Sequence, residues 1–157
     1  MEGDLRRPTL HRVFGLTNQV GITNFLLGST EAAVITRDVG LFGLRVITSG
    51  PIPPNPAEVL GSKRMREFIQ RCRREYDYVI IDTPPTLAVA DSTVLASMVD
   101  GVILVVSSGE VSIDKINKAK NQLLGVKANI LGVVLNGTTS ESSEDYYYYH
   151  YQSKGGD

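Results

Sequence analysis

The chain has 157 residues, of which 42% are hydrophobic and 21% are charged, and its formal net charge is −1. This length suits one soluble globular domain, while the charge argues against a nucleic-acid partner and gives no general attraction to anionic membranes. A single cysteine, Cys72, excludes an internal disulfide framework and suits a reducing cytosol, and the sequence shows neither a signal peptide nor an apolar run that could span a bilayer.

Helical and strand patterns alternate along most of the chain. The predicted helices cover residues 9–14, residues 22–27 up to Gly28, a segment that starts at the N-cap Asn55, residues 90–98 with Asp91 as cap, and a segment that starts at the cap Ser112. The predicted strands cover residues 44–49, 78–81, 102–106 and 130–135, and the last three are apolar enough to be fully buried. Such alternation predicts βαβ units and a parallel sheet.

The helix that follows Asn55 is amphipathic. Its apolar residues form one face and include Met65, Phe68, Ile69, Cys72 and Tyr76, so Cys72 is interpreted as a core residue. Its arginines fall mostly elsewhere, at Arg64, Arg66, Arg71, Arg73 and Arg74. That basic face could meet an acidic partner, although a solvated face is the commoner arrangement and the one we favour.

The stretch from Tyr78 to Pro85 contains the main candidate functional residue, Asp82. Its apolar run ends on Asp82, and two prolines then prevent the strand from continuing. Ligands of open α/β sheets bind at the ends of parallel strands, so Asp82 is well placed to hold Mg²⁺ beside a nucleotide. A solvated aspartate in a turn is an equally good reading of this stretch taken alone.

The chain changes character after Asn136. Residues 137–145 form a polar, acidic linker, and five tyrosines follow at Tyr146, Tyr147, Tyr148, Tyr149 and Tyr151. Phenols beside acids can accept phosphoryl groups, or they can stack on a partner. We therefore divide the chain into a folded domain, residues 1–136, and a flexible tail, residues 137–157.

Several motifs together resemble the cytoplasmic catalytic domain of bacterial tyrosine kinases that regulate capsular and exopolysaccharide synthesis, which are relatives of the MinD/ParA P-loop ATPases. Residues 3–8 resemble the end of the Walker A′ motif, and the stretch around Asp82 resembles Walker B. Residues 50–58 resemble the family's Pro-Pro-Asn-Pro loop, residues 132–136 resemble its late strand, and the tyrosine cluster resembles its autophosphorylation tail.

The resemblance implies roles for particular residues. Asp82 would hold or orient Mg²⁺, Asp4 would assist Mg²⁺ binding or accept the tyrosine proton, and Glu2 would occupy the neighbouring catalytic position. Asn136 would contact the adenine of ATP. The tail tyrosines would be phosphorylated by a neighbouring kinase subunit. Other implied partners are a membrane-embedded activator and a cognate tyrosine phosphatase, with the domain in the cytoplasm, peripheral to the inner face of the cell membrane.

No Gly-x-x-x-x-Gly-Lys-Ser/Thr sequence occurs in the chain, and Glu2 stands where the family has aspartate. We therefore expect a three-layer α/β fold with a mainly parallel sheet and helices on both faces that lacks the Walker A strand and helix. Because a Gly-rich loop cradles the phosphates, we expect weak or no Mg-ATP binding and no kinase activity from this chain alone. The alternatives are a MinD/ParA-type ATPase and a noncatalytic module that presents its tyrosines.

Overall fold

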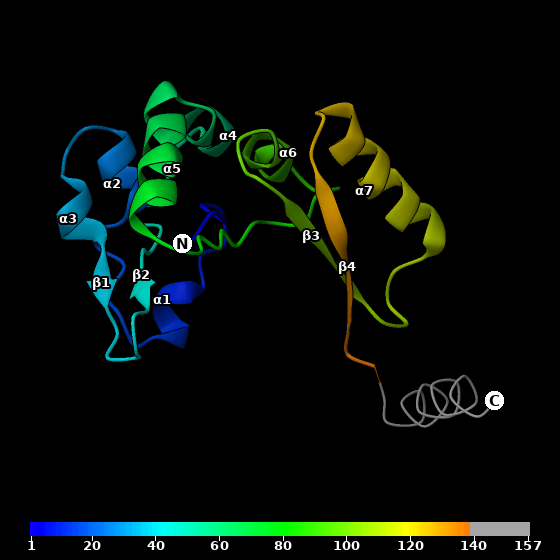
Figure 1. Ribbon diagram of the computed structural model, residues 1–157, viewed down its shortest axis with the longest axis horizontal. Coiled ribbons are helices and arrows are strands. Elements are labelled where there is room, and N and C mark those ends of the chain that lie inside the picture. Colours follow the sequence, from blue (N-terminus) through cyan, green and yellow to red (C-terminus); the bar gives the residue numbers. More distant parts are fainter. Residues whose placement is uncertain (139–157) are drawn as a thin grey trace, which may run out of the picture.

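The computed structural model describes residues 1–138 and alternates helices with short strands (Figure 1). The helices are α1 (Leu10–Val13), α2 (Ile22–Leu26), α3 (Ala32–Ile35), α4 (Pro56–Leu60), α5 (Lys63–Glu75), α6 (Asp91–Ala96) and α7 (Ile113–Gly125). The strands are β1 (Arg37–Asp38), β2 (Arg45–Val46), β3 (Val102–Ser107) and β4 (Ile130–Asn136). The tyrosine tail that the sequence analysis singled out lies outside the described residues.

The α/β class is confirmed by the pairing of β3 with β4. The two strands run parallel, with Leu104 opposite Val133 and Ser107 opposite Asn136, and α7 connects them along the chain. The pair β1 and β2 is antiparallel, with Arg37 opposite Val46. It includes residues 37–38, which none of the predicted elements covers, and it shortens the predicted strand at residues 44–49.

Capping explains why the helix predicted after Asn55 is two helices. Asn55 is the N-cap of α4 and Pro56 occupies its first turn, as the sequence predicts. A second cap follows at Ser62, whose hydroxyl oxygen accepts a hydrogen bond from the Met65 backbone N–H at 3.2 Å and starts α5. The predicted apolar face of α5 is confirmed by the burial of Met65, Phe68, Ile69 and Cys72.

Two hydrophobic clusters make the core, and α6 belongs to both. The larger cluster includes Leu5, Ile22, Phe68 and also Leu95 of α6. The smaller cluster joins Ala96 of α6 to Leu123 and Ala128, with partly buried side chains of β3 and β4 against it. Figure 1 shows α6 between the helices around α5 and the pair β3–β4. This helix therefore connects the two parts of the fold.

The predicted burial of three strands was wrong. Residues 78–81 are not in a regular strand, and Tyr78 is 90% exposed and Ile80 79% exposed. Within residues 1–138, β3 pairs only with β4, and its Ile103 and Val105 are 58% and 61% exposed. The side chains of β4 are also largely exposed. An apolar run is buried only when other elements cover both of its faces, and among the described residues α7 and α6 cover one face of β3–β4.

Candidate functional site

The start of the chain lies beside the stretch that ends at Asp82. The Met1 ammonium donates to the Ile80 carbonyl at 2.7 Å, and the Asp82 N–H donates to the Met1 carbonyl at 3.0 Å. The Gly3 N–H then donates to the Asp82 carbonyl at 2.7 Å, which makes Glu2 and Asp82 a parallel bridge. Two segments about 80 residues apart are thereby joined by backbone hydrogen bonds, although neither belongs to one of the four strands.

Gly3 allows these two segments to approach closely. A Cβ atom added at Gly3 would lie 2.5 Å from the Asp82 carbonyl oxygen and 2.9 Å from Cγ2 of Ile81. Neither approach is compatible with a side chain, so glycine is required here by the neighbouring backbone and not by a left-handed turn.

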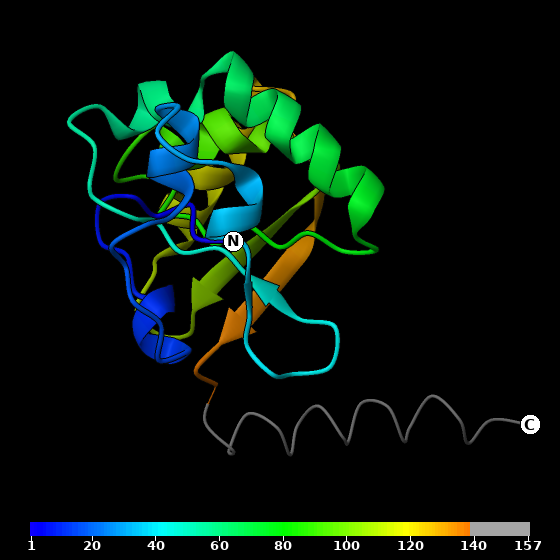
Figure 2. The same cartoon turned by 90° about the vertical axis from the view of Figure 1, so that its left-hand side faces the viewer.

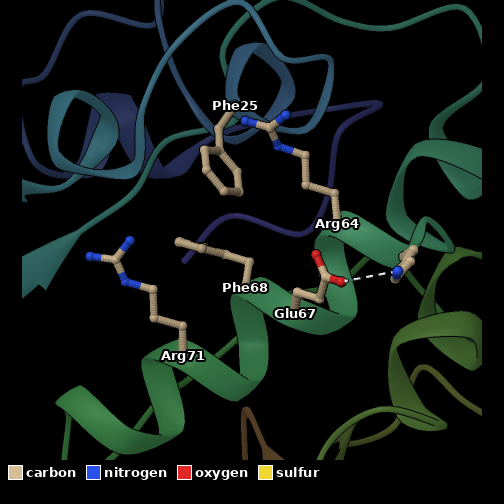
Figure 3. Close-up of a pocket in the computed structure, with 6 residues that line it drawn as sticks. Phe25, Arg64, Glu67, Phe68 and Arg71 are labelled. Atoms are coloured by element: carbon tan, nitrogen blue, oxygen red, sulfur yellow. Dashed lines mark ion pairs between the residues drawn. The ribbon is translucent and has the colours of Figure 1, made fainter.

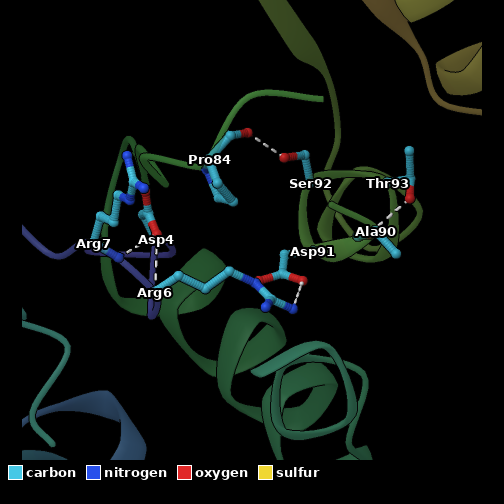
Figure 4. Close-up of polar contacts among 8 residues, drawn as sticks. All are labelled: Asp4, Arg6, Arg7, Pro84, Ala90, Asp91, Ser92 and Thr93. Carbon is cyan, nitrogen blue, oxygen red and sulfur yellow. Dashed lines mark hydrogen bonds and ion pairs between the residues drawn. The ribbon is translucent and has the colours of Figure 1, made fainter. Parts of the chain in front are cut away.

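Asp4 and Asp82 follow this backbone pairing directly. The Asp4 Oδ1 atom accepts hydrogen bonds from the backbone N–H groups of Arg6 and Arg7, both at 2.9 Å, and these bonds fix the turn that follows (Figure 4). Asp4 is half-buried and Asp82 is exposed. Mg²⁺ commonly takes one or two carboxylates together with water and phosphate oxygens, so this donor set fits a magnesium ion that is shared with a nucleotide.

Helix α6 holds the two loops that carry these acids. Both guanidinium contacts of Arg6 go to the fully buried Asp91 carboxylate, with Nε–Oδ2 at 2.9 Å and Nη2–Oδ1 at 3.0 Å. The Ser92 hydroxyl donates to the Pro84 carbonyl in the loop after Asp82 (Figure 4). Two consecutive residues of α6 thus anchor the loop after Asp4 and the loop after Asp82.

The Arg6–Asp91 pair was missed by the sequence analysis, which assigned Asp91 as a helix cap. The N-cap of α6 is Ala90, and Asp91 makes no capping bond because it faces Arg6. A buried carboxylate needs a charged or hydrogen-bonding partner. The available signal was the arginine pair after Asp4, but nothing in the sequence indicates which acid it would meet.

Glu2 is buried and faces α1. Its Oε2 accepts hydrogen bonds from the N–H groups of Thr9 at 3.1 Å and Leu10 at 2.7 Å, where α1 begins. Burial raises the pKa of the Glu2 carboxyl above its usual range, and the two backbone N–H groups oppose that rise. Oε1 is also buried and has no hydrogen-bond partner within the described part of the chain. Glu2 therefore makes a structural contact with α1, and the catalytic role predicted for Glu2 stays a prediction.

Asn136 lies in the β3–β4 pair, away from the paired segments that carry Glu2, Asp4 and Asp82. It ends β4 opposite Ser107, its carbonyl accepts a hydrogen bond from Ser108 at 2.8 Å, and its side chain is exposed. The predicted site residues therefore divide between two places: Glu2, Asp4 and Asp82 come together, while Asn136 stands at the carboxyl end of β4. The five predicted acceptor tyrosines fall beyond residue 138.

Residues 1–138 limit which metal sites and membrane-spanning helices this part of the chain contains. No group of three or more His, Cys, Asp and Glu side chains in that range is arranged to hold a metal ion alone. Any cation at Asp4 and Asp82 would therefore need ligands from water or from a nucleotide. Across the same residues, no helix combines the length and apolar character needed to cross a membrane.

Comparisons with known proteins match this architecture. The family model ParA, described as NUBPL iron-transfer P-loop NTPase, matches residues 58–156. The kinase domain of VpsO is 34% identical, with a TM-score of 0.83, and the match covers 88% of this chain and 68% of that domain. This chain belongs to the bacterial tyrosine-kinase family of P-loop NTPases.

Other relatives agree with this assignment. Tyrosine-protein kinase YwqD of Bacillus subtilis is 45% identical over 137 residues, which are 87% of this chain and 58% of YwqD. The kinase domain of Escherichia coli ETK is 36% identical, with a TM-score of 0.84, and the match covers 87% of this chain and 54% of that domain. The chain thus spans just over half the length of these two relatives, and the P-loop NTPase fold predicted from the motifs is confirmed.

Proposed function

We propose that this chain supplies the carboxylate side of an ATP-dependent protein-tyrosine kinase centre that acts in capsular or exopolysaccharide synthesis. The observation that carries this proposal is the pairing of Gly3 with Asp82, because it brings Asp4 and Asp82 to the ends of two adjacent parallel segments. Family membership supports it, since YwqD and CapB carry tyrosine-kinase names and the ETK domain shares the fold.

Each residue has a defined part in this proposal. Asp82 holds or orients Mg²⁺, which would neutralise charge on the transferring phosphoryl group. Asp4 assists the metal or takes the proton from a tyrosine hydroxyl as its oxygen bonds to the γ-phosphorus and ADP leaves. Glu2 supports this edge from the adjacent position, and its buried carboxyl fixes the start of α1 beside the acids. Asn136 contacts adenine from the end of β4.

The proposal is tested by supplying the part of the kinase domain that this chain does not match. The chain is fused behind a segment of YwqD chosen to supply the family's Gly-rich phosphate loop, and tyrosine phosphorylation is followed by mass spectrometry with Mg-ATP. We expect phosphate on the tail tyrosines Tyr146, Tyr147, Tyr148, Tyr149 and Tyr151. We also expect little labelling by the chain alone, because a Gly-rich loop is needed to position the phosphates.

Matched variants of the fusion separate the site from general charge effects. Replacing the metal-site carboxylate, Asp82→Asn, should lower labelling by about 10- to 100-fold, the range seen when the surroundings of a bound metal are disturbed. Asp77→Asn removes the same charge from an exposed residue before the paired stretch and should leave labelling unchanged. Equal labelling by the two variants would contradict the assignment of Asp82. Tyr78 is 90% exposed, so burial does not protect it from labelling.

The proposed partners follow from family membership and not from contacts in this chain. We propose a membrane-embedded activator protein, neighbouring kinase subunits and a cognate tyrosine phosphatase, with the domain held at the inner face of the cell membrane. The proposed activator is tested by co-purifying the fused chain with a candidate membrane protein from the same bacterium. Failure of the two proteins to co-purify would count against this partner.

A further inference from the structure

An open cleft of about 420 Å³ lies between α2 and α5, apart from the acidic residues described above (Figure 3). It combines aromatic rings with charged side chains. The lining residues are Phe25, Lys63, Arg64, Glu67, Phe68 and Arg71. Its size is within the range of ligand-binding clefts.

The aromatic part of the cleft is already ordered by contacts within the chain. The ring centroids of Phe25 and Phe68 are 4.7 Å apart, at an interplanar angle of 46°. The guanidinium carbon of Arg64 lies 4.6 Å from the centroid of Phe25, which is cation–π distance. Figure 3 shows the two rings between the guanidinium groups of Arg64 and Arg71. A planar aromatic group entering here would meet the partly buried ring of Phe25 and cationic groups, while Phe68, which is 4% exposed, supports Phe25 from the core.

The charged part of the cleft is mainly positive. Three cationic side chains, Lys63, Arg64 and Arg71, line it against one acid, Glu67. Glu67 is paired with Lys63 at 3.6 Å, and Arg71 is paired with Glu75 at 2.7 Å, but all four of these side chains remain about half exposed or more. Such exposed pairs are weak, so an incoming carboxylate can compete for the cations.

We propose that this cleft binds the acidic, tyrosine-rich segment, residues 141–151, of a second copy of the chain. The segment offers the carboxylates of Glu141, Glu144 and Asp145 together with five tyrosines. Its carboxylates match the cations of α5, and its phenol rings match the ring of Phe25 and the guanidinium planes. The cleft has a net positive charge and the segment has a net negative charge, so the two attract each other.

The position of the cleft favours a second copy over the chain's own tail. The segment follows Thr138, just beyond the end of β4. Figures 1 and 2 both place α5 at the top of the molecule and the end of β4 at the bottom. A neighbouring copy can present its segment to α5 directly, whereas the chain's own segment would have to pass around the domain.

Binding of a labelled peptide to the full chain tests the cleft. The probe is an unphosphorylated peptide of residues 139–152 carrying a fluorophore, followed by anisotropy. We expect saturable binding that R64A/R71A weakens by about ten-fold, the combined effect of two exposed charge contacts and one cation–π contact. The matched control R66A/R74A removes the same charge from exposed residues of α5 that do not line the cleft, and it should change binding by less than about two-fold.

A mixing experiment then tests whether the segment comes from a second copy. One variant carries R64A/R71A, and the other carries serine at all five tail tyrosines. Each should lose the part of self-association that depends on the cleft, and a mixture should regain it, because one intact cleft then meets one intact segment. Sedimentation velocity of the separate and mixed variants measures this, and circular dichroism verifies that each is folded.

The proposal is overturned by no peptide binding, by equal weakening in R64A/R71A and R66A/R74A, by binding of a tyrosine-phosphorylated peptide alone, or by no recovery on mixing. Peptide binding requires neither ATP nor phosphoryl transfer. Its failure would leave the proposed kinase function standing, and a failed kinase assay would leave this contact standing.

Discussion

Replacing Gly3 by alanine should separate the two segments that carry Asp4 and Asp82. The new Cβ would lie 2.5 Å from the Asp82 carbonyl oxygen, and both are attached to backbone that cannot swing aside. Overpacking costs about 1–3 kcal/mol. The shift would also weaken the 2.7 Å bond from the Gly3 N–H to Asp82, a loss of about 1 kcal/mol. Alanine restricts the unfolded chain and returns about 0.4–1 kcal/mol, so the net loss should be about 1–3 kcal/mol.

Urea unfolding followed by circular dichroism measures this loss, and Gly132→Ala is the matched control. Gly132 lies in β4, where no heavy atom of the described residues comes within 4 Å of the position of an added Cβ. The same chemical change there should be neutral or stabilising by up to about 1 kcal/mol. Equal effects of the two substitutions would refute the claim that close backbone approach, and not strand propensity, makes glycine necessary at position 3.

Three further predictions concern buried or paired side chains. Burial raises the pKa of Glu2 above its ordinary 4.5, so above pH 4.5 the folded chain binds more protons than the unfolded chain. The free energy of unfolding, measured relative to that of the Glu2→Gln variant, should therefore fall as the pH rises from 4.5 through the raised pKa. A difference between the two proteins that stays constant with pH in urea titrations would contradict this. Burial also raises the pKa of the Cys72 thiol above 9.0, so a disulfide reagent should modify it slowly in the folded chain and quickly in urea, and equal rates would contradict its burial. Arg6→Ala should speed amide hydrogen exchange at Arg7, measured by NMR, without changing exchange in α7; unchanged exchange at Arg7 would mean that the contact with Asp91 does not hold the loop.

Local patterns in the sequence predicted the positions of the helices except α3, although not the break between α4 and α5, because helix signals lie within a few residues of one another. The apolar stripe of α5 and the Asn55–Pro56 start of α4 depend on helical spacing and on backbone groups at the helix end. Strand burial depends instead on what covers each face. Ile80 and Ile103 are apolar members of strand-like runs, yet both are exposed in this chain. The apolar composition of such a run indicates that its residues can be buried, but it does not show which elements cover each face of the strand.

The candidate site could be predicted in part for a related reason. A short motif marks Asp82, and a second motif marks Asp4, so their identities followed from the sequence. Their proximity depends on backbone bonds between Met1–Gly3 and Asp82, and parallel pairing of such distant segments leaves no local signal. The same holds for Arg6 and Asp91, which are 85 positions apart. Charge pairs of this kind are chosen by the fold and not by spacing along the chain.

Helix α6 couples the geometry of the acids to the packing of the whole domain. Asp91 and Ser92 hold the loops after Asp4 and Asp82, while the next turn of the same helix places Leu95 and Ala96 in the two hydrophobic clusters. A small rotation of α6 would disturb both clusters, and close-packed interiors resist such changes. The two loops are therefore held in register by burial one turn further along the same side of a six-residue helix. A ligand that moved the loops after Asp4 and Asp82 would have to work against that packing, so we expect the two loops to keep their positions when a ligand binds.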